Sequence, residues 1–153
     1  KEKLSREASQ DALTGLFNRG AYDLWMESTD TEHVALILID VDHFKEVNDT
    51  YGHDVGDKVL KRVAEVLRGN FRSVDILCRI GGDEFAAIYE TRGEANVKSL
   101  CEQIKETLIE DNLDLGYPLT IGVGYAKYRG ADMPLDMLYD LADKALYIDK
   151  NSG

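Results

Sequence analysis

The clearest hydrophobic pattern in the chain is the segment HVALILID, residues 33–40, in which six consecutive apolar residues precede Asp40. A strand with one solvated face alternates apolar and polar residues, whereas a strand buried on both faces does not. This segment has the length of a strand and shows no alternation. We therefore predict that it forms the central strand of a sheet and that the chain leaves the core at Asp40.

Elsewhere, apolar residues recur at the spacing of amphipathic helices. The spacing predicts helices over residues 20–27, 54–67, 97–108 and 135–148. In the first of these helices, the side chains expected to face the core are Tyr22, Trp25 and Met26. Further strands are predicted over residues 73–80, 84–89 and 117–128. The first two would form a hairpin, because Gly81–Gly82 suits a two-residue type I′ turn with positive φ angles. One sheet with several helices and an antiparallel pair indicates an α+β domain.

Acidic residues follow the predicted strand ends. Asp40 and Asp42 end the central strand, and Asp83 and Glu84 stand at the tip of the hairpin. If the hairpin pairs beside the central strand, these carboxylates converge and repel one another. A hard divalent cation removes the repulsion, and oxygen ligands without cysteine or histidine favour Mg²⁺ or Mn²⁺. Because such ions also bind phosphates, the pattern indicates metal-assisted phosphoryl or nucleotidyl transfer.

Each of these features also has a simpler interpretation. An Asp-x-Asp after a strand is commonly a solvated turn, and a glycine turn followed by acids commonly exposes its charges. The segment NDTYGHDVGD, residues 48–57, also fits a loop and an N-capped helix with Asp54 in its first turn. These residues alone leave open both a metal–phosphate site and a merely acidic surface.

Composition narrows the class of protein. The chain has 153 residues, 44% of them hydrophobic, which suits one domain with a core. Its net charge of −11 argues against binding a nucleic-acid polymer, because a phosphate backbone needs clustered lysine and arginine. Cys78 and Cys101 lie in apolar patterns without metal-ligand spacing, so we expect buried free thiols rather than a disulfide.

The ends of the chain suggest a part of a longer protein. It begins at Lys1 rather than methionine, with a charged, helix-prone segment. We expect residues 1–10 to be the end of a linker or signalling helix and residues 11–153 to be the domain. No segment has the roughly 18 consecutive apolar residues that a membrane span requires.

Four motifs occur in order along the domain. They are DALTGLFNR at 11–19, DVDHFKEVNDTYGHDVGD at 40–57, GGDEF at 81–85 and ADKALYIDKNSG at 142–153. Together they resemble the GGDEF family, the bacterial diguanylate cyclases that join two GTP molecules into cyclic di-GMP. The resemblance implies a central, mostly antiparallel sheet flanked by helices, as in the palm of polymerases and in nucleotide cyclases.

The resemblance also implies roles for individual residues. The divalent metal ligands would be Asp40, the backbone carbonyl of Val41, Asp83 and Glu84. The Asp83/Glu84 pair would also supply the catalytic base. The residues implied in GTP binding are Asn48 and Asp57 for guanine, Phe44, Lys45 and Lys150 for the phosphates, and Gly81 and Gly82 for close backbone approach. By contrast, we expect Asp42 to support its loop rather than to bind metal.

Arg72 and Asp75 match the family's inhibitory site, where the product cyclic di-GMP binds. A surface ion pair at the start of a strand is the alternative interpretation.

The implied reaction needs two GTP molecules, and hence a homodimer with facing active sites. We further expect an upstream sensory domain and a cytoplasmic location for the domain, with membrane anchoring of the parent protein left open. The alternatives are a catalytically silent domain that acts as a receptor for GTP or cyclic di-GMP, a scaffold with an acidic surface, and a cyclase for another nucleotide.

Overall fold

The structure is a computed structural model that describes residues 9–28, 34–91, 96–110, 119–128 and 133–151. Its helices are α2 (Arg19–Ser28), α3 (Phe44–Tyr51), α4 (His53–Asn70), α5 (Val97–Glu110) and α6 (Leu135–Asn151). Its strands are β1 (Val34–Val41), β2 (Ile76–Arg79), β3 (Glu84–Glu90) and β4 (Ile121–Lys127). The predicted linker segment lies almost wholly outside the described residues.

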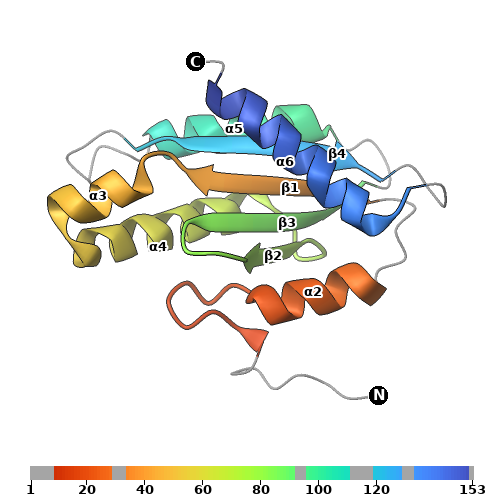
Figure 1. The fold of residues 1–153 in the computed structure, drawn as a ribbon, viewed down its shortest axis with the longest axis horizontal. Helices are drawn as coiled ribbons and strands as arrows, with labels where there is room; N and C mark the ends of the chain where they lie inside the picture. The colour runs from red at the N-terminus through yellow and green to blue at the C-terminus, as the bar shows by residue number, and fades with distance from the viewer. Residues whose placement is uncertain (1–8, 29–33, 92–95, 111–118, 129–132, 152–153) are drawn as a thin grey trace.

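The strands form one sheet in the order β2-β3-β1-β4, and the three pairings are antiparallel (Figure 1). The hairpin strand β3 pairs directly with β1, as the convergence of the acidic residues requires. The α+β prediction with a mostly antiparallel sheet is therefore confirmed.

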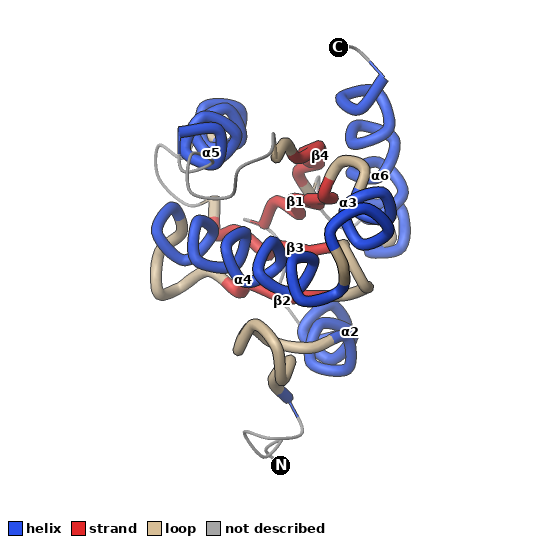
Figure 2. The backbone as a smooth tube through the Cα atoms, turned by 90° about the vertical axis from the view of Figure 1, so that its left-hand side faces the viewer, coloured by secondary structure: helices blue, strands red, loops and turns tan. Residues whose placement is uncertain are grey.

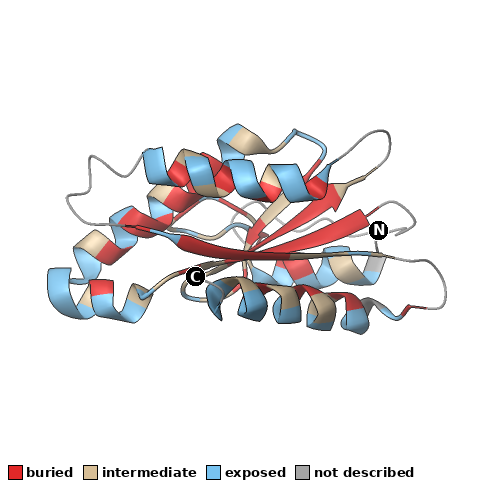
Figure 3. Ribbon diagram, turned by 90° about the horizontal axis from the view of Figure 1, so that it is seen from above, coloured by how far each residue is buried: buried red, intermediate tan, exposed pale blue. Residues whose placement is uncertain are grey.

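Both faces of the sheet are covered by helices. Figure 2 shows α4 and α5 on one side of the strands and α2 and α6 on the other. Ile37 and Ile39 of β1 belong to the core cluster on the α4 and α5 side, whereas Leu36 and Leu38 belong to the cluster on the α6 side. The strands consequently appear as a buried layer between the helices (Figure 3). The prediction that β1 is buried on both faces is confirmed.

Helix α6 lies against β4 because two residues of that strand have no side chain. A Cβ atom at Gly124 would come within 2.1 Å of the backbone nitrogen of Leu146 and 2.5 Å of the carbonyl oxygen of Ala142. At Gly122, a Cβ would lie 2.5 Å from Cγ of Lys150. The two glycines therefore allow the helix backbone and the stem of Lys150 to approach the sheet directly.

The predicted type I′ turn is wrong. Residues 80–83 separate β2 from β3, and neither Gly81 nor Gly82 has a positive φ angle. The backbone nitrogens of Ile80 and Gly81 both donate to the carbonyl oxygen of Glu84, at 2.9 and 3.3 Å. The connection spans residues 80–83 and is therefore longer than a two-residue turn. Both hydrogen bonds that close it end on the same carbonyl, that of Glu84.

Other expectations differ in detail. Trp25 was expected to face the core, but 41% of it is exposed, while Tyr22 is buried on the same helix. Strand β2 begins at Ile76 rather than residue 73, because the backbone nitrogen of Asp75 donates to the carbonyl oxygen of Arg72 and closes a turn. The described part of the strand predicted over 117–128 begins at Ile121.

The thiols and the helices agree with two further expectations. Cys78 and Cys101 are buried and free, and burial raises the pKa of each thiol to about 12. None of the helices in the described ranges is long and apolar enough to cross a membrane.

Candidate active site at the edge of the sheet

The acidic residues of β1 and of the hairpin meet at one edge of the sheet. Asp40 is the register partner of Glu84, and such partners place their side chains on the same face of an antiparallel pair. The backbone nitrogen of Val41 donates to the carbonyl oxygen of Asp83 at 3.2 Å. The structure thus brings together Asp40, Val41, Asp83 and Glu84, the four residues expected to bind metal.

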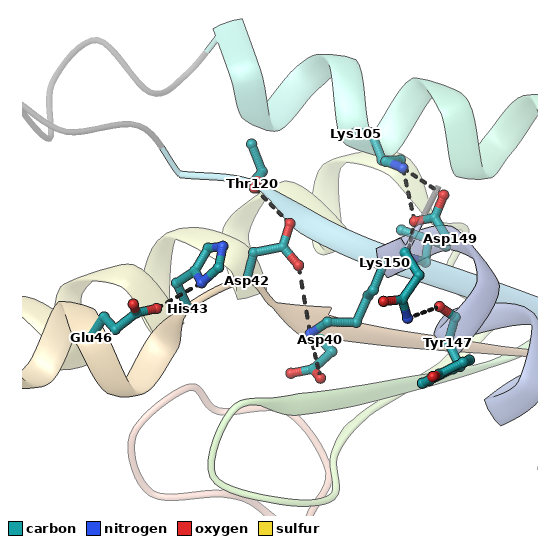
Figure 4. Close-up of polar contacts among 11 residues, drawn as sticks. Asp40, Asp42, His43, Glu46, Lys105, Thr120, Tyr147, Asp149 and Lys150 are labelled. Carbon is teal, nitrogen blue, oxygen red and sulfur yellow. Dashed lines mark hydrogen bonds and ion pairs between the residues drawn. The ribbon is translucent and has the colours of Figure 1, made fainter. Parts of the chain in front are cut away.

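Lys150, near the end of α6, reaches over Gly122 into this group. Its Nζ lies 2.9 Å from Oδ2 of Asp40 and 3.5 Å from Oδ1 of Asp42 (Figure 4). Lys150 therefore forms an ion pair with Asp40 and offsets part of the negative charge at this edge.

Asp42 is held from the other side by the segment before β4. Its Oδ2 accepts a hydrogen bond from the hydroxyl of Thr120 at 2.6 Å, and its backbone nitrogen donates to the carbonyl oxygen of Thr120 at 3.0 Å (Figure 4). These contacts fit the expectation that Asp42 supports its loop.

The close packing of the acids changes their protonation. Burial, followed by the negative charge of Asp40, raises the pKa of Asp83 to about 6. Burial and the charges of Asp40 and Asp143 also raise the pKa of Glu84. Burial lowers the pKa of Lys150, but its hydrogen bond to Asp40 and the nearby acids outweigh that effect and raise it. The site consequently favours a state with less negative charge or with an added cation.

The residues fit a hard divalent ion. Oδ1 of Asp40 is buried and has no hydrogen-bond partner among the described residues, so it has lone pairs to offer a cation. The available donors are carboxylate and carbonyl oxygens, which Mg²⁺ and Mn²⁺ prefer. Within the described ranges, no three acidic, histidine or cysteine side chains already surround one point. Metal binding would therefore require the acidic side chains to turn toward a common centre.

The residues expected to bind nucleotide lie on α3, α4 and the hairpin loop. Phe44 and Lys45 begin α3 directly after His43, which has a left-handed conformation with φ 56°. Nδ1 of His43 lies 2.6 Å from Oε1 of Glu46 in the first turn (Figure 4). Backbone nitrogens at the start of a helix are suited to binding a phosphate.

Asn48 and Asp57 come close through the packing of α3 on α4. The side chain of Asn48 lies against Gly56, where a Cβ would be 1.8 Å from Oδ1 of Asn48. Asp57 follows Gly56 directly and is exposed. The two residues expected to read guanine are thus neighbours in space, on the helices that follow the acidic end of β1.

Arg72 and Asp75 form a closed arrangement away from the acidic edge. Oδ2 of Asp75 accepts from the backbone nitrogen and Nε of Arg72, at 2.9 and 3.1 Å, and Oδ1 accepts from Nη2 at 2.9 Å. Oδ1 also accepts from the backbone nitrogen of Glu90 at 3.1 Å. The guanidinium of Arg72 lies over the ring of Tyr89, 4.3 Å from its centroid. The side chain of Asp75 is 0% exposed and that of Arg72 is 45% exposed, so the ion pair lies at the surface with its carboxylate covered.

The sequence profile of the family described as "Diguanylate cyclase, GGDEF domain" matches residues 8–153. The chain belongs to the GGDEF family. Among curated relatives, the probable diguanylate cyclase DgcT of Escherichia coli (strain K12) is 36% identical over an alignment of 155 residues that covers 95% of this chain and 34% of DgcT. The diguanylate cyclase DgcS of Shewanella oneidensis is 36% identical over an alignment of 158 residues that covers 99% of this chain and 53% of DgcS. The GGDEF chain thus spans about a third to about half of these relatives.

Solved structures share the fold of this GGDEF domain. The GGDEF domain of DgcB from Caulobacter crescentus, in complex with c-di-GMP, aligns with a TM-score of 0.85 at 32% identity, covering 99% of this chain and 95% of that one. Diguanylate cyclase SiaD from Pseudomonas aeruginosa, in complex with its activator SiaC, aligns with a TM-score of 0.83 at 29% identity, covering 97% of this chain and 60% of SiaD.

The sequence pattern did not predict some of the residues that lie at the acidic edge of the GGDEF domain. Thr120 supports Asp42, and burial together with the charge of Glu84 raises the pKa of Tyr139. The charge of Arg19 acts on both Glu84 and Tyr139. A signal for Tyr139 was present, because it lies eleven residues before Lys150 and hence on the same face of α6.

Proposed function

We propose that this GGDEF domain is a diguanylate cyclase that condenses two GTP molecules into cyclic di-GMP and two pyrophosphates, with Mg²⁺ or Mn²⁺. The observation that carries the proposal is the acidic edge itself. The acids of the GGDEF signature adjoin Asp40 in a site where a buried carboxylate oxygen lacks a partner and two carboxyl pKa values are raised. The named relatives support the same activity.

The chain's residues divide the work as follows. Asp40, the carbonyl of Val41, Asp83 and Glu84 would hold the metal. A bound divalent ion would offset negative charge that develops at the α-phosphate and favour ionisation of the attacking 3′-hydroxyl. The Asp83/Glu84 pair would accept the proton of that hydroxyl.

Nucleotide binding involves the two neighbouring helices and the last turn of α6. The carboxylate of Asp57 accepts from the N1–H and 2-amino groups of guanine, and the amide of Asn48 donates to a ring acceptor. Phe44 and Lys45 offer backbone nitrogens to the β- and γ-phosphates, while Gly81–Gly82 lets the hairpin backbone approach them. When metal and GTP bind, the ammonium group of Lys150 would leave Asp40 and pair with the terminal phosphate.

The reaction requires two domains. In each, the 3′-oxygen of one GTP forms a bond to the α-phosphorus of the other, the bond between the α-phosphorus and the bridging oxygen breaks, and pyrophosphate leaves. One site holds one GTP, so two sites must face each other in a twofold homodimer. We place this domain in the cytoplasm, where GTP is made, and downstream of a sensory domain that brings the partners together.

Product inhibition is assigned to Arg72 and Asp75. Both carboxylate oxygens of Asp75 are engaged with Arg72 and Glu90, so cyclic di-GMP would reach Asp75 only after Arg72 swings outward. Arg72 is exposed enough to make that movement and to stack on a guanine base.

The test is product formation from GTP at high protein concentration, after bound nucleotide has been stripped. We expect cyclic di-GMP with Mg²⁺ or Mn²⁺, none with ATP as the only nucleotide, and none from the Asp83→Asn/Glu84→Gln double variant. A protein that binds GTP but makes no product, even when dimerised through a coiled coil fused at Lys1, would be a receptor instead.

A further inference from the structure

The last turn of α6 is attached to the edge strand β4 by the carboxylate of Asp149. Strand β4 is last in the order of the described strands, so its outward backbone groups have no neighbouring strand to pair with. The backbone nitrogen of Val123, in the middle of β4, donates instead to Oδ2 of Asp149 at 2.9 Å. The side chain of a helical residue therefore takes the place of a neighbouring strand at this point of the sheet.

The same carboxylate binds a lysine from the opposite face of the sheet. Nζ of Lys105, on α5, lies 2.9 Å from Oδ1 and 2.8 Å from Oδ2 of Asp149 (Figure 4). Because α5 and α6 cover opposite faces (Figure 2), this ion pair passes around the edge of β4. Both charged side chains are partly exposed, so water screens the pair, whereas Val123 is buried. The hydrogen bond from Val123 is consequently the stronger of the two restraints on Asp149.

This attachment determines where the next residue, Lys150, lies on the sheet. Gly122 directly precedes Val123 and is the register partner of Asp40. A Cβ at Gly122 would lie 2.5 Å from Cγ and 3.1 Å from Cδ of Lys150, so the lysine stem crosses β4 at this glycine. Its Nζ then lies 2.9 Å from Oδ2 of Asp40. A change in the seating of this helical turn would therefore move the ammonium group away from the acidic edge.

The turn that carries Lys150 needs such a restraint because it is the last of the helix. Helix α6 ends at Asn151, and the final carbonyl groups of a helix have no partners within it. Helix ends therefore fray unless side chains or packing hold them. Nδ2 of Asn151 donates to the carbonyl oxygen of Tyr147 at 2.8 Å and closes the turn on itself (Figure 4). Asp149 attaches this closed turn to the sheet.

We propose that Asp149 is a positioning residue, which accepts the hydrogen bond of Val123 and thereby holds Lys150 at the acidic edge. The proposal rests on the proposed function, in which the ammonium group of Lys150 pairs with the terminal phosphate of GTP. Asp149 itself would touch neither metal nor nucleotide. Without its carboxylate, the helix end is free to move, and fixing Lys150 on the phosphate then costs additional conformational entropy.

The experiment compares two nucleotides by isothermal titration calorimetry in saturating Mg²⁺. The α,β-methylene analogue of GTP carries the terminal phosphate but cannot react, whereas GMP lacks that phosphate and reports whether the rest of the site is intact. The variants are Asp149→Ala, Lys150→Met, the double variant that combines them, and Asp149→Asn, which keeps an acceptor oxygen for Val123. Asp140→Ala is the matched control, because it removes the same charge from an exposed position of the same helix.

The expected losses follow from the contact that Lys150 would make. A hydrogen bond between charged groups is worth about tenfold or more in affinity, and the side chain of Lys150 is 30% exposed, which favours the lower end. We expect Lys150→Met to bind the GTP analogue about tenfold more weakly and Asp149→Ala about fivefold more weakly, with the affinity for GMP unchanged in both. Because both changes act through one ammonium group, the double variant should lose about tenfold rather than the roughly 50-fold of independent effects.

The two remaining variants separate positioning from charge. Asp149→Asn should bind the GTP analogue within about twofold of the wild type, because its amide oxygen can still accept from Val123, and Asp140→Ala should match the wild type.

Wild-type affinity of Asp149→Ala for the GTP analogue would overturn the proposal. An equal loss for GMP would also overturn it, since a general disturbance of the fold weakens both nucleotides, and so would independent losses in the double variant. Asp149→Asn that binds as weakly as Asp149→Ala would remove the role given to the Val123 hydrogen bond. If the affinities follow the expected pattern but the wild type forms no cyclic di-GMP, the proposed cyclase activity fails and the role of Asp149 stands. If the wild type forms cyclic di-GMP and Asp149→Ala binds like it, the cyclase stands and the role of Asp149 fails.

Discussion

Replacing Gly124 by alanine inserts a methyl group between β4 and α6. The new Cβ would lie 2.1 Å from the backbone nitrogen and 2.5 Å from Cα of Leu146, and 2.5 Å from the carbonyl oxygen of Ala142. Ordinary contacts begin near 3.4 Å, so the helix backbone would have to retreat by about 1 Å. Backbone atoms cannot rotate away as a side chain can. We therefore expect the upper end of the usual cost of overpacking, about 3 kcal/mol.

The assay is thermal unfolding followed by circular dichroism. In a domain of this size each kcal/mol lowers the melting temperature by about 2–4 °C, so Gly124→Ala should lower it by about 6–12 °C. Gly69→Ala is the matched control, because no atom lies within 4 Å of a Cβ at this position in α4. That variant should gain about 0.5 kcal/mol from helix propensity. A melting temperature of Gly124→Ala at or above that of the wild type would refute the close seating of α6.

Three further outcomes are expected. Gly56→Ala should turn the amide of Asn48 away, because the new Cβ would lie 1.8 Å from its Oδ1. Since Asn48 is proposed to bind guanine, steady-state kinetics should show KM for GTP raised about tenfold with little change in kcat. Asp75→Ala should lower the free energy of unfolding in urea by about 2 kcal/mol, because it removes the carboxylate that pairs with Arg72 and accepts hydrogen bonds from the backbone nitrogens of Arg72 and Glu90. Burial, followed by nearby negative charge, raises the pKa of Asp83 to about 6. The metal-free folded state therefore binds this proton more tightly than the unfolded chain does. The free energy of unfolding should consequently fall as pH rises from about 4 to about 6. After allowance for solvent screening the loss is about 1 kcal/mol, and comparing melting temperatures at pH 5 and 7.5 should show it in the wild type but not in Asp83→Asn.

The sequence was most informative where local pattern and burial agree. The unbroken apolar segment that ends at Asp40 predicted a strand buried on both faces, and β1 is that strand. The meeting of Asp40 with Glu84 followed from placing the hairpin beside it. Both inferences depend only on the preference of apolar residues for the interior and on pairing within one sheet.

Features that depend on tertiary packing were not predictable in this way. Gly81–Gly82 fits a type I′ turn locally, but hydrogen bonds to Glu84 decide the actual loop. Lys150 reaches Asp40 across Gly122 of β4, and nothing near Lys150 in the sequence records that contact. The exposure of Trp25 likewise depends on how α2 packs against the rest of the protein.

The central claim is that two of these domains join two GTP molecules across facing acidic sites. It is tested most directly by the initial rate of cyclic di-GMP formation at saturating GTP and Mg²⁺, measured over a series of protein concentrations below the dimerisation constant. If the domains act in pairs, the rate rises with about the square of the protein concentration and becomes linear once the domain is fused to a dimeric coiled coil. A rate that is linear throughout for the unfused chain, or no product from the fused dimer, would contradict the account.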